Sequence, residues 1–135
     1  MPADVELGIH LCYGDSGEHH FVEPADAGVL VEFANRLLPL VLRPFAWLHL
    51  PVPIERDDDA YYAPLERLEL PAETELYLGL VHREDGIEGA RRREAVAARH
   101  VGRPFGIATE CGMGRAPREQ TRSLLEAQGA TSAAW

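Results

Sequence analysis

The chain has 135 residues and a formal net charge of -9, from 13 basic and 22 acidic side chains. An acidic chain lacks the cationic face that nucleic acids and anionic membranes require, so we expect neither as a partner. Every basic residue is arginine, and without lysine the chain has neither Schiff-base chemistry nor a P-loop. The sequence has no basic leader and no apolar run of about 18 residues, which predicts a cytoplasmic protein.

Four short apolar segments are predicted to form strands because glycine, proline or aspartate bounds each of them. They span residues 5–12, 45–52, 75–82 and 105–111. Amphipathic stretches predict helices at 27–42, 86–100 and 117–128, and a weaker one at 63–68. The pattern is therefore a strand and a helix, repeated four times.

Such alternation predicts an α/β fold with a parallel sheet and right-handed crossovers. Four units make half of an eight-unit barrel, and apolar strands that end in polar side chains are typical of a barrel's catalytic rim. We therefore expect a (β/α)4 half of a TIM-barrel-like fold over residues 1–128, followed by a frayed tail at 129–135. An open four-stranded sheet is the alternative. The exposed edges of half a barrel predict a homodimer, or a partner that supplies the missing half.

Residues that commonly bind metals stand at the ends of the predicted strands. His10 and Cys12 are two positions apart, so an extended segment points both side chains to one face. His49 and Cys111 end other strands, and in a parallel sheet these ends lie on one side. We predict a metal site formed by His10, Cys12 and Cys111, with His49 as fourth ligand or as a core or substrate-facing residue. The competing interpretation is that all four are ordinary buried side chains.

Period-two alternation along the last strand separates the side chains of Glu110 and Cys111. If the strand continues to this point, the two residues face opposite sides of the sheet, and we favour Cys111 as the ligand. The run of three arginines at 91–93 lies within a predicted helix and is expected to form a solvated face.

Other polar residues are candidates for catalysis or substrate binding. Asp15 lies in the loop after the first strand and His82 ends the third strand, so either could hold or move a proton. Tyr61 follows an acidic run and could contact a polar substrate. Arg115 lies in a glycine-containing loop between a strand and a helix, where an anion could bind.

The His-x-Cys at the end of one strand and the Glu-Cys-Gly at the end of the last resemble motifs of the cobalamin-independent methionine synthase family. In that family they lie in the C-terminal half of the catalytic barrel. The wider superfamily also includes uroporphyrinogen decarboxylase-like barrels. Residues 21–24, 57–61 and 78–82 are similar to segments of an uncharacterised bacterial branch of this superfamily.

The resemblance implies a metal ion and a reaction. His10, Cys12 and Cys111 match three zinc ligands of the synthases, and the position of the family's glutamate ligand falls at or beside His49. In the family, Zn²⁺ activates homocysteine as a thiolate, which then takes a methyl group from a methylated folate. The resemblance therefore implies a methyltransferase of methionine biosynthesis, with a small-molecule thiol and a methyl donor as its substrates.

Two further hypotheses remain open. One is a metal-independent, decarboxylase-like enzyme in which Arg56 and Arg115 hold substrate carboxylates while His49 or His82 handles protons. The other is a non-catalytic half-barrel that acts as an assembly module.

Overall fold

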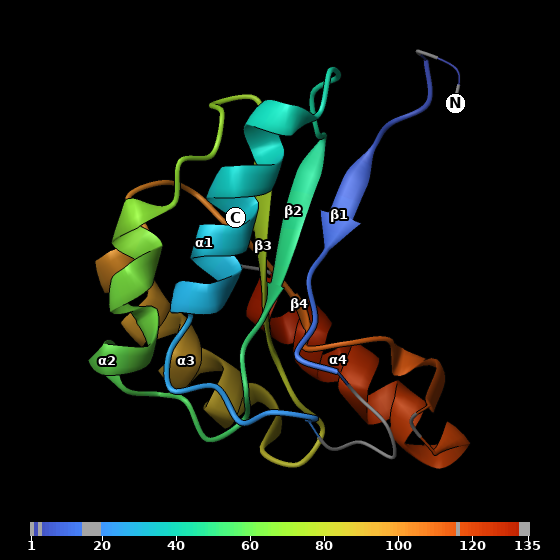
Figure 1. Cartoon of the computed structure of the whole chain (residues 1–135). Helices are drawn as coiled ribbons and strands as arrows, with labels where there is room; N and C mark the ends of the chain where they lie inside the picture. Colours follow the sequence, from blue (N-terminus) through green and yellow to red (C-terminus); the bar gives the residue numbers. More distant parts are fainter. Residues whose placement is uncertain (1, 3, 15–19, 116, 133–135) are drawn as a thin grey trace.

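The computed structural model describes residues 2, 4–14, 20–115 and 117–132, and its centre is a sheet of four strands in the order β1-β2-β3-β4 (Figure 1). The strands are β1 (Gly8–His10), β2 (Trp47–Pro51), β3 (Glu75–Val81) and β4 (Gly106–Thr109). All three neighbouring pairs are parallel. The predicted α/β class and parallel sheet are confirmed.

A helix follows each strand along the chain. The four helices are α1 (Gly28–Leu37), α2 (Asp59–Tyr62), α3 (Gly86–His100) and α4 (Thr121–Ser132). Short 3-10 turns extend α1 and α2 and precede α4. Helix α4 continues past residue 128, so residues 129–132 of the expected tail are helical. None of the described helices combines the length and the apolar character that crossing a membrane requires.

The hydrophobic core lies between the helices and one face of the sheet. Alternate strand residues point into it, and each is at most 7% exposed: Leu48, Leu50, Leu76, Leu78 and Ile107. The opposite face is more open, because Trp47 and Tyr77 on that face are half-buried and Glu75 is exposed. Parallel sheets are usually covered on both faces, so this one is unusual in the part of the chain described here.

Arg93 ties α3 to the middle of the sheet. Its side chain is fully buried, with Nε donating to the Leu80 carbonyl at 2.9 Å and Nη1 donating to the Ile54 carbonyl at 2.8 Å. Two further bonds of 2.8 Å join its guanidinium to the Asp85 carboxylate. The prediction that residues 91–93 form a solvated face is therefore wrong for Arg93, which lies on the face of α3 that packs on β3.

Gly79 allows β3 and β4 to approach closely where their pairing is irregular. A Cβ atom at this position would lie 2.6 Å from the Cα atom of Glu110 and 3.0 Å from the carbonyl oxygen of Thr109. The strand register shifts between Leu78 and Val81, on either side of this contact. A side chain at position 79 would therefore collide with the backbone where the chain leaves β4.

Candidate metal centre

Three of the predicted ligands come together at the carboxyl ends of the strands. One ligand atom from each of His10, Cys12 and Cys111 lies within 4.8 Å of the others. The two sulfur atoms are 3.8 Å apart, and the sulfur of Cys111 is 3.7 Å from Nε2 of His10. Neither cysteine is in a disulfide. This grouping confirms the predicted association of the two strand ends.

The two distances from the sulfur of Cys111 are close to those of a tetrahedral zinc site. With Zn–S bonds of about 2.3 Å and Zn–N bonds of about 2.0 Å, a tetrahedron has edges of about 3.8 Å between two sulfurs and about 3.5 Å between sulfur and nitrogen. The corresponding distances here are 3.8 Å and 3.7 Å. An ion can therefore bind without changing the distance from Cys111 to Cys12 or to His10.

Hydrogen bonds from the core position Cys12. The hydroxyl of Tyr13, the next residue, lies 3.0 Å from the hydroxyl of Tyr61. Tyr61 is 1% exposed and donates its own hydrogen to the carbonyl of Pro51, also at 3.0 Å. Because Tyr61 uses its only hydrogen in this way, Tyr13 is the donor in the first bond. The segment that carries Cys12 is thus bonded to the end of β2.

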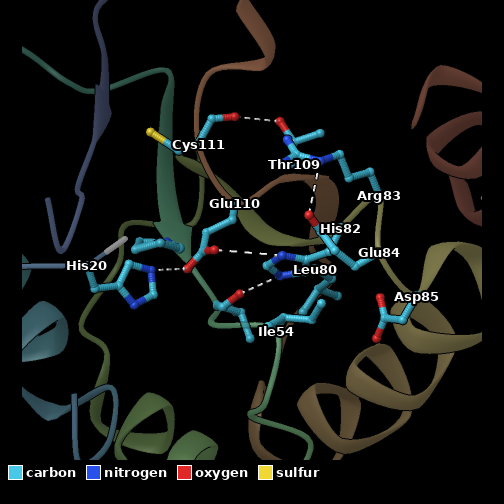
Figure 2. A network of polar contacts seen from close by, with 12 residues as sticks. His20, Ile54, Leu80, His82, Arg83, Glu84, Asp85, Thr109, Glu110 and Cys111 are labelled. Carbon is cyan, nitrogen blue, oxygen red and sulfur yellow. Dashed lines mark hydrogen bonds and ion pairs between the residues drawn. The ribbon is translucent and has the colours of Figure 1, made fainter. Parts of the chain in front are cut away.

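The chain bend after β4 positions Cys111. The strand ends at Thr109, and the Thr109 hydroxyl donates to the Cys111 carbonyl at 2.7 Å (Figure 2). Period-two alternation therefore no longer applies at Cys111. Its sulfur lies near His10 even though Ile107, two residues before Thr109, points into the core on the other side.

His49 lies beside the three grouped ligands, in register with His10 on the neighbouring strand. Its Nδ1 is 2.6 Å from Nδ1 of His10, and its Nε2 is 3.1 Å from the carbonyl oxygen of Thr109. Burial, and next the neighbouring His10, lower the pKa of His49 to about 4. Burial also lowers the pKa of His10. Both rings are therefore neutral at pH 7, and both nitrogens of His49 already have partners.

A second polar cluster is centred on Glu110, the residue before Cys111. Its carboxylate lies 2.8 Å from Nε2 of His20 and 3.7 Å from Nδ1 of His82 (Figure 2). Nε2 of His82 lies 2.8 Å from the carbonyl of Val52. Burial, and next the charge of Arg93, lower the pKa of His82 to about 4.

Two hollows meet at Cys111. One, of about 340 Å³, is lined by residues that include His82, Glu110 and Met113. The other, of about 460 Å³, lies on the open face of the sheet and includes Trp47 and Tyr77. Small molecules could therefore reach the cysteine from two directions.

The remaining candidate residues are not gathered at this centre. Tyr61 is buried, with its hydroxyl bonded as described above. Arg56 is held by Asp58 through bonds of 2.9 and 3.2 Å. Asp15 and the side chain of Arg115 lie outside the part of the chain that the structure describes. Their proposed roles in proton transfer and substrate binding stay predictions.

Two features of this centre were not predicted from the sequence. The hydrogen bond from His49 to the Thr109 carbonyl involves a backbone atom, which leaves no signal in the sequence. The pairing of Glu110 with His20 depends on a loop returning to β4, and these residues are 90 positions apart. The expected separation of Glu110 and Cys111 onto opposite faces requires a strand that continues to residue 111, whereas β4 ends at Thr109.

No family model, no curated protein and no solved structure matches this chain. The similarity to cobalamin-independent methionine synthases therefore depends on the motifs alone.

Proposed function

We propose that the chain binds Zn²⁺ through His10, Cys12 and Cys111 and that the site serves methyl transfer to a substrate thiol. The observation that carries the proposal is that the three ligand atoms lie within 4.8 Å of one another and that the two distances from the Cys111 sulfur are close to the edges of a zinc tetrahedron. Two cysteine thiolates would balance the charge of the ion, and a neutral imidazole would complete the set.

Three protein ligands leave one tetrahedral position open, which is typical of catalytic rather than structural zinc sites. A bound Zn²⁺ would supply a Lewis acid that keeps a substrate thiol deprotonated near neutral pH. The ligands of this chain orient the site toward two hollows, one polar around Glu110 and one aromatic around Trp47. One hollow can therefore receive the thiol while the other receives the methyl donor.

The reaction that we propose is a displacement at the methyl carbon of a methylated folate. The thiol gives its proton to solvent, and its sulfur forms a bond to the methyl carbon. The bond between that carbon and the folate nitrogen breaks, and its electron pair stays on the nitrogen, which takes up a proton from solvent. The products are a thioether and the demethylated folate.

We further propose that the four strand-helix units form one half of a TIM-barrel-like fold. Sequential parallel strands and helices packed against one face support this assignment. The open face, with Trp47, His49 and Tyr77, would then be the lumen side, and a second half-barrel would cover it.

Metal content of the freshly purified protein tests the zinc site directly. We expect about one zinc per chain by elemental analysis, and intense sulfur-to-cobalt absorption after exchange with Co²⁺. Cys12→Ser and Cys111→Ser should each weaken zinc binding by at least tenfold and reduce the cobalt absorption, because each removes a thiolate.

The matched control is His100→Gln, which removes a histidine on α3 that is bonded to Asp59 and Glu66 and lies away from the grouped ligands. This variant should bind zinc as the wild type does. A protein without zinc, whose metal affinity is the same with and without Cys12, would overturn the proposal.

A further inference from the structure

We propose that His49 is a positioning residue that sets the tautomer of His10, so that the Nε2 lone pair of His10 faces Cys111 before any ion binds. The inference rests on the proposed zinc site. It gives His49 a role other than that of the fourth ligand.

The hydrogen-bond directions follow from the partner of His49 on β4. The carbonyl oxygen of Thr109 can only accept, so Nε2 of His49, at 3.1 Å, carries a hydrogen and donates it. A neutral imidazole has a single N–H, and Nδ1 of His49 is therefore an acceptor. Nδ1 of His10 lies 2.6 Å away and must donate to it.

The consequence appears on the far side of the His10 ring. With its hydrogen on Nδ1, His10 has a lone pair on Nε2, and this atom lies 3.7 Å from the sulfur of Cys111. Metal ions bind only the nitrogen without a hydrogen. In water the neutral side chain favours the opposite tautomer, with the hydrogen on Nε2. The bond to His49 would thus reverse the intrinsic preference of His10.

The arrangement of strands holds this chain of hydrogen bonds, from His10 through His49 to the Thr109 carbonyl, in place. We call it the relay. Register pairing brings His10 and His49 side by side on β1 and β2, and the accepting carbonyl belongs to the last residue of β4. His49 is 8% exposed, so water has little access to compete for its nitrogens. Loss of a hydrogen-bond partner of a metal-binding histidine typically lowers metal affinity by about 10- to 100-fold.

The test reads the His10 tautomer by long-range ¹H–¹⁵N correlation NMR of metal-free protein at pH 7.5, with His10→Gln used to assign the signal. We expect the Nδ1–H tautomer to predominate in the wild type. His49→Phe removes both nitrogens, and it should shift His10 toward the Nε2–H tautomer and weaken zinc binding by about 10- to 100-fold. His49→Gln keeps a donor and an acceptor, and it should preserve the tautomer and most of the affinity.

His82→Gln is the matched control, because His82 is also buried and bonded to a backbone carbonyl but has no bond to His10. It should leave the His10 tautomer unchanged. An Nε2–H tautomer in the wild type, or an unchanged tautomer and affinity in His49→Phe, would overturn the relay. Because the NMR measurement needs no metal, it also decides the relay if His49→Phe fails to fold. Absence of zinc binding together with an Nδ1–H tautomer would refute the proposed function and support the relay.

Discussion

The centre of the sheet and its two edges are built from different interactions. Near the two central strands, the fully buried Arg93 of α3 bonds to the carbonyl of Leu80 in β3, to the carbonyl of Ile54 after β2, and to Asp85. At the ends of β1 and β4, His10 and Cys12 are exposed and Cys111 is partly exposed. The centre has the interactions that stabilise the fold, whereas the edges hold the groups that can bind an ion. Variants should therefore separate stability from metal binding.

Replacing Arg93 should have the largest effect on stability. Arg93→Met leaves the carbonyls of Leu80 and Ile54 without their donor and removes the partner of Asp85. We expect a loss of about 3–5 kcal/mol in the free energy of unfolding, the range for breaking a buried ion pair. Urea unfolding followed by circular dichroism measures this change.

The neighbouring Arg92 provides the control. Its side chain is 56% exposed, and it makes longer ion pairs of 3.4 Å with Asp57 and 3.3 Å with Asp85. Arg92→Met should cost less than about 1 kcal/mol. Equal losses in the free energy of unfolding for the two variants would contradict the prediction. They would show that the buried bonds of Arg93 contribute no more to stability than exposed ion pairs do.

Acidification should also weaken the centre, through His82. Its pKa is lowered to about 4 in the folded chain by burial, whereas an unfolded chain binds the proton below pH 6.5. His82 therefore does not affect the free energy of unfolding above pH 6.5. Between pH 6.5 and 4 the free energy of unfolding falls, by about 3 kcal/mol in total.

His82→Gln should flatten this dependence by the equivalent of about one proton between pH 6.5 and 4. The measurement is the free energy of unfolding at a series of pH values. Parallel curves for the wild type and the variant would contradict the prediction, and they would mean that His82 is protonated equally in both states.

Gly79 connects the centre to the edge, so its replacement should affect both properties. Gly79→Ala forces a Cβ atom against the backbone of Glu110 and Thr109, at a cost of about 1–3 kcal/mol. Because Cys111 follows directly, zinc affinity should also fall. Gly102→Ala is the control, since no atom lies within 4 Å of its added Cβ. Titration with zinc and thermal unfolding of both variants would test this. Unchanged zinc affinity in Gly79→Ala would show that the metal site does not depend on the packing of Gly79 against the end of β4.

The smallest effect is expected on the helical surface, at His100. Its imidazole bonds to Glu66 at 2.7 Å and to Asp59 at 2.8 Å, and these two bonds raise its pKa. The stabilisation is complete below pH 6.5 and is lost as the pH rises through the raised value. The difference in melting temperature between wild type and His100→Gln should therefore shrink at high pH and at high salt. A difference that is constant across pH would contradict this assignment.

The pattern of apolar residues was sufficient to predict the fold class. Each predicted strand contains an observed one, because short apolar runs bounded by turn residues have few alternatives. Boundaries were less accurate. The helix predicted at 27–42 ends at Leu37 and continues only as a 3-10 turn containing Pro39, since proline removes a backbone donor.

The candidate site was predictable where it depends on topology and unpredictable where it depends on backbone contacts. His10, Cys12 and Cys111 were expected to meet because parallel strand ends share one side of the sheet. The burial of Arg93 was not foreseen, because an arginine beside two others on a helix is ordinarily solvated. The close approach at Gly79 depends on an irregular register that no local sequence pattern encodes.

Cys12 and Cys111 are separated by 99 positions along the chain, so their sulfurs meet only after β1 and β4 have both joined the sheet. Long-range contacts of this kind close large loops, and we expect them to form late in folding. An ion that binds the completed set stabilises the native state without stabilising earlier species. If the site binds zinc as we propose, zinc should slow unfolding and leave the refolding rate unchanged, and the lifetime of the folded protein would then depend on zinc supply.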